Sequence, residues 1–249
     1  MKVAGARMLV VGGVHRLGGA LALDLAAHGA AVCVSSRTTG VEADAQVGAL
    51  RAAGAPAAAA LAGDVRRPAA AAGLVAAAAA ALGGLDGLVY AASGPFVPRP
   101  PEGVDEVSWD ASLDTIAKGF FFTAVAARGR FLGGAAAGGA IVAITDYLGL
   151  QPWTAFAAHG AAKAAQIHLV KELARAWAAD GVRVCGVAPG PVDLEDDEHR
   201  AATLRAAARV AAERLVAPAD IGAAVRFCLE TDAVTGANVV VDNGSLVTS

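Results

Sequence analysis

Two glycines near the start of the chain have the spacing of a phosphate-binding turn. Residues 9–20 read as a short apolar strand, a turn and the start of an apolar helix. Gly12 can adopt backbone angles that other residues avoid, and Gly18 lets the backbone approach a pyrophosphate. The helix expected over residues 17–28 would aim its free amides and positive dipole end at that anion. Because Arg16 stands where a middle glycine is common, the turn alone also fits a purely structural role.

The elements that position this turn are expected to alternate between strand and helix along the chain. Short continuous apolar runs indicate strands buried on both faces, and the longer runs between them indicate helices. The later strands are expected at residues 30–35, 56–61, 85–90, 140–145, 182–187 and 238–241. The later helices are expected at residues 41–53, 68–82, 105–132, 155–179, 199–215 and 219–230. This alternation predicts an α/β protein with a Rossmann-type, doubly wound parallel sheet of about seven strands.

Composition limits the class of protein. The chain has 249 residues, of which 56% are hydrophobic and 17% charged, so a large core is expected and disorder is not. The net charge is −3 with both signs scattered, which argues against a nucleic-acid surface. Three widely separated cysteines lack metal-ligand spacing and indicate reduced thiols in a cytoplasmic protein. No signal peptide or linker is visible, and we expect one domain over residues 1–249.

An uncharged stretch over residues 68–85 is long enough to raise a membrane helix. It is mostly alanine with three glycines, and alanine gains little from lipid but favours a helix. We therefore expect a helix packed on the sheet and no contact with a membrane.

Several motifs together resemble those of the short-chain dehydrogenase/reductase family, over nearly the whole chain. Residues 11–18 match the family's T-G-x-x-x-G-x-G turn, with Val11 for threonine and Arg16 for the middle glycine. That arginine variant is similar to pteridine reductases. The other matches are Asp64-Val65, Tyr90-Ala91-Ala92-Ser93-Gly94, Pro189-Gly190-Pro191-Val192, Thr235-Gly236 and Val241-Asp242-Asn243-Gly244.

The resemblance implies a set of cofactor-binding residues that follow the strands. Asp64 and Val65 stand where the family contacts adenine, and Pro189 with Gly190 stands where it approaches the nicotinamide. The full set is Gly12, His15, Arg16, Leu17, Gly18, Ser36, Arg37, Asp64, Val65, Ala91, Ala92, Ser93, Lys163, Pro189, Gly190 and Val192.

The residues after the second strand bear on the choice between NAD and NADP. A NAD site usually carries an acid there for the ribose hydroxyls, whereas this chain has Ser35-Ser36-Arg37. Arg37 can pair with a 2′-phosphate, and Arg16 on the neighbouring turn could add a second cation. The alternative is that Arg37 only begins a solvated loop. We therefore expect NADP(H) as the cofactor. We expect no metal, because His15, His28, His168 and His199 show no ligand spacing.

The family's catalytic set of Asn, Ser, Tyr and Lys is largely replaced. In the family, the tyrosine of Y-x-x-x-K donates a proton to the carbonyl, and the lysine assists it and holds the ribose. Here Lys163 remains, and His159 stands at the tyrosine position. Asp146 stands at the serine position, as in pteridine reductases, and the asparagine position falls near Ile116. A histidine can donate a proton near neutral pH and a carboxylate can orient it, so Asp146 and His159 form a workable acid pair beside Lys163.

Residues 145–149 and Ala162-Lys163-Ala164 also resemble enoyl-thioester reductases of the same fold, which use Y-x6-K. The residue seven before Lys163 is Phe156 (163 − 7 = 156), so that tyrosine is absent too. Tyr147 is the nearby phenol and could replace the donor. Because enoyl reduction delivers hydride to carbon and needs only a stabilised enolate, reduction of C=C stays open.

Other segments could surround a substrate. Trp153 and Phe156 line a pocket or belong to the core. The acidic run at residues 194–200 stands where the family has a substrate lid, or is a solvated loop. A proline-rich loop at residues 95–101 follows the fourth strand and lies at the mouth of the expected site.

The sequence therefore predicts an NADP(H)-dependent oxidoreductase that acts on a small carbonyl, a pterin-type C=N or a conjugated C=C. Its catalytic residues would be Asp146, His159, Lys163 and Tyr147. The alternative, favoured by the loss of Tyr, Ser and Asn, is a non-catalytic dinucleotide-binding homologue that acts as a sensor or partner subunit. The resemblance also implies a homotetramer built on the helices at 105–132 and 155–179. We expect a small-molecule substrate and no nucleic-acid or membrane partner.

Overall fold

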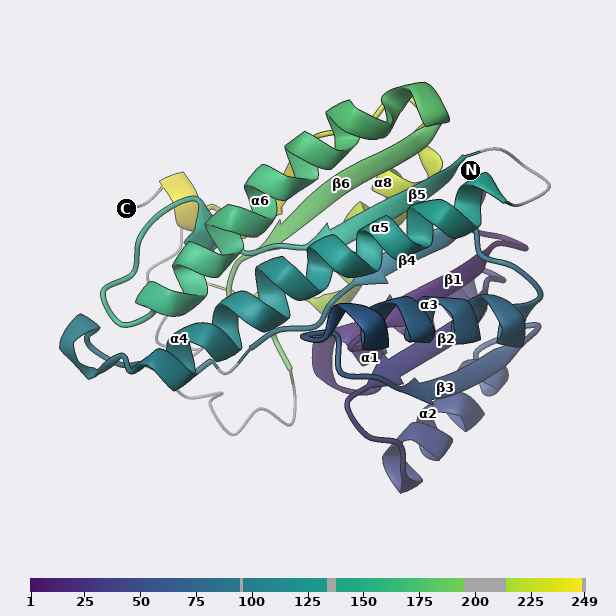
Figure 1. Ribbon diagram of the computed structural model, residues 1–249, viewed down its shortest axis with the longest axis horizontal. Coiled ribbons are helices and arrows are strands. Elements are labelled where there is room, and N and C mark those ends of the chain that lie inside the picture. The colour runs from purple at the N-terminus through teal and green to yellow at the C-terminus, as the bar shows by residue number, and fades with distance from the viewer. Residues whose placement is uncertain (95, 134–137, 195–213, 248–249) are drawn as a thin grey trace.

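A seven-stranded sheet forms the middle of the molecule, with helices on both of its faces (Figure 1). The computed structural model describes residues 1–94, 96–133, 138–194 and 214–247. The strand order is β3-β2-β1-β4-β5-β6-β7, and each strand runs parallel to its neighbours. The chain order reverses between β1 and β4, which is the mark of a doubly wound sheet. The predicted fold class is therefore confirmed.

The strands follow the predicted apolar runs closely. Their bounds are β1 Arg7–Val11, β2 Ala31–Ser36, β3 Ala58–Ala62, β4 Gly87–Tyr90, β5 Gly139–Ile144, β6 Val182–Pro189 and β7 Asn238–Val241. The five inner strands are buried along nearly their whole length, whereas the edge strands β3 and β7 are only partly buried. Inner strands covered on both faces need apolar side chains on both, which is why they show no alternation of polar residues.

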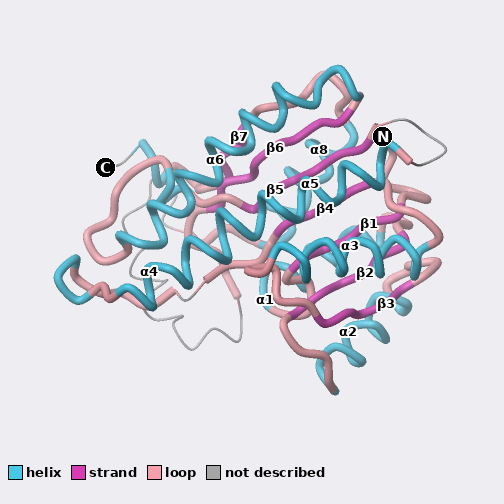
Figure 2. The backbone as a smooth tube through the Cα atoms, in the orientation of Figure 1, coloured by secondary structure: helices cyan, strands magenta, loops and turns pink. Residues whose placement is uncertain are grey.

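The helices form two layers, one on each face of the sheet (Figure 2). Their bounds are α1 Arg16–Ala27, α2 Val41–Ala52, α3 Pro68–Leu82, α4 Glu106–Leu113, α5 Gly119–Leu132, α6 Ala157–Trp177 and α8 Pro218–Glu230. One apolar cluster joins α1 and α8 to the sheet through Leu25 and Ile221. The other joins α3, α5 and α6 to the opposite face through Leu74, Phe120 and Val170.

The single helix expected over residues 105–132 is interrupted. Asp105 caps α4 by accepting a hydrogen bond from the Ser108 amide at 2.8 Å. Asp114–Lys118 then form a π-helical segment before α5 begins. The hydroxyl of Tyr90, buried at the end of β4, donates a hydrogen bond to the Thr115 carbonyl within that segment at 2.6 Å. The widened π-helical turn offers a backbone carbonyl to a side chain of the sheet. The regular helix that the sequence predicts here would not do so.

The uncharged stretch forms α3, and its buried side chains Ala71, Leu74, Val75 and Ala78 pack in the core as predicted. Over the ranges that the structure describes, no helix has the length and apolar character needed to cross a membrane. The expected helix at 199–215 and the acidic run at 194–200 fall largely outside the described residues.

Candidate active site

The parallel strands bring the predicted site residues to one edge of the sheet. Gly12 follows β1, Arg37 follows β2, Ala91 follows β4, and Gly190 follows β6. Asp146 stands two residues beyond the end of β5 at Ile144. In doubly wound sheets, ligands bind at the carboxyl ends of the strands, beside the point where the strand order reverses. That point lies here between β1 and β4.

Both turn glycines are required by the protein's own packing. Gly12 has φ of +76°, and a Cβ there would lie 2.9 Å from the backbone of Ala92. A Cβ on Gly18 would collide with the carbonyl oxygen of Gly12. The amides of Gly12 and Gly13 donate hydrogen bonds to the Ser35 carbonyl at 2.9 and 3.1 Å. Besides leaving room for a pyrophosphate, Gly18 therefore lets α1 begin directly against a turn that is fixed to β2.

The amino end of α1 is suited to an anion. Its N-cap residue, His15, is extended and makes no capping hydrogen bond with its side chain, and the first turn carries no acid. The first amides of a helix need hydrogen-bond acceptors, and a phosphate oxygen can be one. Arg16 has φ of +49°, a left-handed conformation that costs a residue other than glycine about 1 kcal/mol or more. A residue held there at this cost points to a use for its side chain.

The connection after β2 carries the residues that would hold the adenosine ribose. Arg37 is exposed, and the Ser36 hydroxyl donates a hydrogen bond to the Thr38 carbonyl. A cavity of about 290 Å³ lies between this connection and the glycine turn, lined by Val14, His15 and residues 38–43. One acid, Glu42, lines it, with its carboxylate 3.5 Å from His15 Nε2.

The remaining residues predicted to bind the cofactor differ in their surroundings. The Asp64 carboxylate is held by the Arg66 guanidinium at 2.6–3.1 Å, and this pairing lowers the pKa of Asp64 to about 2. The Ala91 amide donates to the Val11 carbonyl at 2.8 Å. Val65 is buried, Leu17 packs against the core, Ser93 is exposed, Pro189 ends β6, and Val192 bridges to Val216.

Asp146 and His159 meet in the structure as the sequence predicts. Asp146 Oδ2 lies 3.0 Å from His159 Nε2, and Asp146 Oδ1 accepts a hydrogen bond from the Leu148 amide at 2.9 Å. The second bond caps the short turn Tyr147–Gly149 and so orients the carboxylate. The side chain of His159 is 5% exposed and that of Asp146 is 21% exposed. Among the described residues, His159 Nδ1 is buried without a hydrogen-bond partner.

Lys163 lies one helical turn beyond His159 and is buried. Its Nζ donates hydrogen bonds to the Ile144 carbonyl at 2.7 Å and to Gln166 Oε1 at 3.3 Å. Burial lowers the pKa of Lys163 to about 8, and the nearby carboxylate of Asp146 partly opposes this shift. An ammonium has three donors, so one remains for a ribose hydroxyl.

Tyr147 is a less suitable acid than its place suggests. Burial raises the pKa of its hydroxyl, and the carboxylates of Asp146 and Asp242 raise it further. Its ring packs edge-on against Trp153, with 5.8 Å between the ring centroids. These surroundings oppose release of its proton, in contrast to the tyrosine that the family uses.

Two residues of this region were not predicted from the sequence. Gln166 is fully buried, contacts Lys163, and has an amide nitrogen without a hydrogen-bond partner in the described part of the chain. Its signal was a lone glutamine three positions after Lys163 on an alanine-rich helix face. Phe96, from the loop after β4, lies edge-on to His159 with ring centroids 4.9 Å apart. No local pattern in the sequence predicts that contact.

In the described residues outside this region, a metal site would show in their chemistry and a second ligand site in a cavity. No cluster of three or more histidine, cysteine or acidic side chains suited to a metal occurs among the described residues. A larger cavity of about 470 Å³, lined by Lys2, Asp86 and Arg183 among others, lies at the opposite edge of the sheet. The candidate site at the carboxyl ends of the strands is therefore supported by the chemistry of its residues and not by the volume of a cavity.

Comparison with known proteins agrees with the doubly wound fold. Residues 13–245 match the family described as Enoyl-(Acyl carrier protein) reductase. The chain is 32% identical over 248 residues to 3beta-hydroxysteroid dehydrogenase 1 of Eggerthella lenta, covering 96% of this chain and 93% of that protein. The chain belongs to the short-chain dehydrogenase/reductase family, and it is an oxidoreductase of that type.

Solved structures show the same fold. A short-chain type dehydrogenase/reductase from Mycobacterium ulcerans is 27% identical with a TM-score of 0.91, over 100% of this chain and 92% of that one. A short chain dehydrogenase from Burkholderia cenocepacia, in complex with NADP, is 28% identical with a TM-score of 0.87, over 99% and 100% of the two chains. A 7 alpha-hydroxysteroid dehydrogenase that shares the fold at 23% identity holds NADH. Members of this fold thus use either nicotinamide cofactor.

Proposed function

We propose that this chain is an NADP(H)-dependent reductase that uses an Asp-His-Lys site in place of the family's tyrosine. Its substrate would be a small molecule with a carbonyl, a pterin-type C=N or a conjugated C=C. The observation that carries the proposal is the 3.0 Å contact between Asp146 Oδ2 and His159 Nε2, with the Lys163 ammonium buried nearby. A relic site would have no need to keep a matched acid pair at this edge of the sheet.

The two members of the pair would divide one task. When bound, NADPH supplies the hydride. In its imidazolium form, His159 would hold a proton at Nε2 against Asp146 and would become a neutral imidazole when that proton leaves. Its 5% exposure makes it a reservoir and not the group that meets the substrate. Asp146 is the more exposed member and would pass the proton to the atom that becomes electron-rich. Lys163 would hold the ribose through its third donor.

The preference for NADP over NAD rests on the end of β2. Ser36 and Arg37 stand where a NAD site usually has an acid, and an arginine can pair with a 2′-phosphate through two parallel hydrogen bonds. Arg16 would add a second cation from the glycine turn. The NADP complex of the Burkholderia cenocepacia relative supports this choice.

A second candidate function is non-catalytic dinucleotide binding, as a sensor or partner subunit. The asparagine position falls near Ile116, which is apolar and fully buried and so offers a substrate no hydrogen bond. This observation favours loss of turnover with retained cofactor binding. The buried Lys163 and the Asp146–His159 pair favour the enzyme.

NADPH consumption, followed by absorbance against ketones, dihydropterins and enoyl thioesters, separates the two. Turnover of any one class identifies a reductase and chooses among the three chemistries. Binding of NADPH without turnover on any class would favour the non-catalytic protein.

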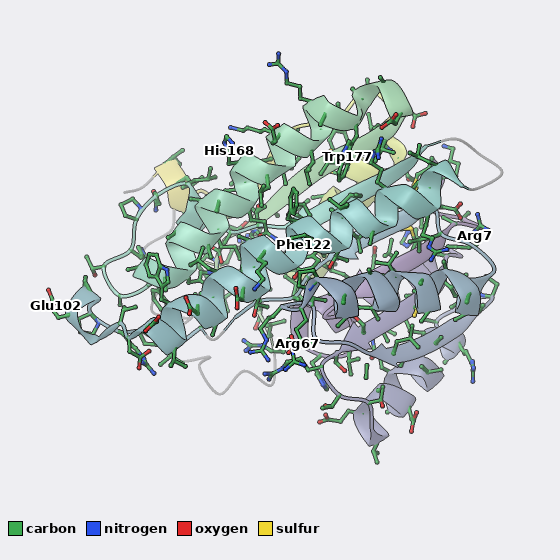
Figure 3. All side chains as sticks on the ribbon, in the orientation of Figure 1. Arg7, Arg67, Glu102, Phe122, His168 and Trp177 are labelled. Atoms are coloured by element: carbon green, nitrogen blue, oxygen red, sulfur yellow. The ribbon has the colours of Figure 1, made fainter. Side chains whose placement is uncertain are left out.

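We also propose that the chain assembles as a homotetramer through α5 and α6. These helices lie in one layer (Figure 1), and α5 exposes the apolar side chains Phe122, Val125 and Leu132. Phe122 on α5 and His168 on α6 lie on the outer side of that layer (Figure 3). Sedimentation analysis of the full chain and of Phe122→Glu tests this, since a buried charge should dissociate the assembly.

A further inference from the structure

A continuous series of ring contacts leads from the buried Tyr147, through partly exposed rings, to His159. It starts with Tyr147 against Trp153, continues through Phe156 and Phe96, and ends on the imidazole. We call these four residues, Tyr147, Trp153, Phe156 and Phe96, the aromatic wall. They come from two different loops, one after β4 and one between β5 and α6.

One pair of rings in the aromatic wall is stacked face to face, and the other contacts are tilted or edge-on. The rings of Phe96 and Phe156 are stacked, with centroids 4.3 Å apart and planes 13° from parallel. Trp153 lies 5.9 Å from Phe156, and Phe96 meets His159 edge-on at 4.9 Å. The two loops are joined by a hydrogen bond from the Arg99 amide to the Ala155 carbonyl at 2.8 Å. This hydrogen bond ties the loop that carries Phe96 to the loop that carries Trp153 and Phe156.

Three rings of the aromatic wall are exposed in part, whereas Tyr147 is buried. Phe96 is 45% exposed, and Trp153 and Phe156 are partly exposed, although large rings gain most free energy when fully buried. The loop's own cation, Arg99, pairs with Asp105 at 3.6 Å, so its charge is already matched. The wall therefore offers an apolar surface beside the acid pair without a cation of its own for a phosphate.

We propose that the aromatic wall binds the body of the substrate, and that this body is a flat, uncharged ring carrying the reacting group beside it. The inference rests on the proposed function, because it takes the acid pair as the place where the substrate reacts. A flat ring packs on stacked aromatic faces with more contact than a flexible chain of the same size, and it loses less conformational freedom on binding.

The test compares two methyl ketones with the same number of carbons, acetophenone and octan-2-one. Their dissociation constants are measured by titration calorimetry on the full chain, with NADP⁺ and without it. We expect acetophenone to bind about three- to tenfold more tightly, which is the effect of one good aromatic contact. Equal binding, tighter binding of octan-2-one, or no binding of either ketone would overturn the proposal.

Substitutions place the preference on the aromatic wall. Phe96→Leu and Phe156→Leu keep an apolar side chain but remove the flat face, so each should bring the two ketones within about twofold of each other. Phe227→Leu on α8 is the matched control, because Phe227 is 48% exposed and belongs to the other helix layer. The control should keep the full preference. A preference that survives both Phe96→Leu and Phe156→Leu would rule out the wall.

NADPH turnover measured on the same preparations separates this inference from the proposed function. Tighter binding of the ring ketone with no turnover of any substrate class would support the role of the aromatic wall and contradict the reductase activity. Turnover without a preference for the ring ketone would support the reductase activity and contradict the role of the aromatic wall.

Discussion

Asp146 and His159 are thirteen residues apart in the chain, and Asp146 Oδ2 lies 3.0 Å from His159 Nε2. One follows β5 and the other lies in the first turn of α6, so a single loop closes the pair. The same carboxylate is held by the Leu148 amide at 2.9 Å, which fixes its orientation. The pair is thus held by a rigid strand end and a helix, as a proton-transfer site requires.

Removing either member of this pair should abolish turnover and spare cofactor binding. We expect His159→Phe and Asp146→Asn each to lower kcat by about 100-fold or more, the usual contribution of general acid catalysis. The dissociation constant of NADPH, measured by fluorescence titration, should change by less than about twofold. His28→Phe, at an exposed position after α1, is the control. Turnover that survives His159→Phe would show that another group supplies the proton.

Arg37→Ala should weaken NADPH far more than NADH. A charge-assisted hydrogen bond contributes about 1.5–3 kcal/mol, so we expect about a 10- to 100-fold loss for NADPH and little for NADH. Competition binding with both nucleotides measures the difference. Arg51→Ala, another exposed arginine on the neighbouring helix, should leave both affinities unchanged. Equal losses for the two nucleotides would show that Arg37 does not read the 2′-phosphate.

Arg16→Gly should stabilise the protein and weaken NADPH. Glycine tolerates the φ of +49° that Arg16 adopts, so the free energy of unfolding should rise by about 1 kcal/mol. Loss of the guanidinium should at the same time raise the dissociation constant of NADPH. Urea unfolding and nucleotide titration measure the two effects. Arg16→Lys keeps both the charge and the strain, and a rise in stability there would argue against the strain.

Gln166 should set the pH range in which Lys163 is charged. The pKa of Lys163 is lowered to about 8, so activity that needs its ammonium should fall as the pH rises through about 8. Gln166→Leu removes the oxygen that accepts from Nζ, which lowers this pKa further and moves the loss to lower pH. Gln166→Glu adds a negative charge and should move it to higher pH.

The measurement is kcat/KM as a function of pH for the three proteins. Opposite shifts from Leu and Glu are the signature of a contact with the ammonium, because a change in packing alone has no reason to reverse sign. Shifts in the same direction would assign Gln166 a purely structural role.

Two glycine-to-alanine substitutions should have opposite effects on stability. Gly48 lies inside α2 with no atom within 4 Å of an added Cβ, so Gly48→Ala should stabilise the protein by about 0.5–1 kcal/mol. In Gly18→Ala the Cβ would strike the Gly12 carbonyl, and we expect a loss of about 1–3 kcal/mol. Thermal unfolding of both variants measures the contrast. If Gly18→Ala left the stability unchanged, the glycine turn would be able to shift and accommodate the added Cβ.

Local patterns determined most of the fold and the outline of the site. Buried strands such as β4 and β5 read as continuous apolar runs because both of their faces are covered. The sequence also predicted the glycine turn, Lys163, and the spacing of Asp146 and His159. These features depend on neighbours in sequence or on the regular geometry of strand and helix, so sequence alone carries them.

Tertiary structure decided what depends on residues far apart in the chain. The π-helical turn at Asp114–Lys118 is tied to Tyr90 across 25 residues, and Phe96 reaches His159 from another loop. The same holds for the direction in which His159 points, since its Nε2 is taken by Asp146 and the ring of Phe96 packs edge-on against it. Hydrogen-bond direction and burial are properties of the assembled surroundings, and no local pattern of residue types encodes them.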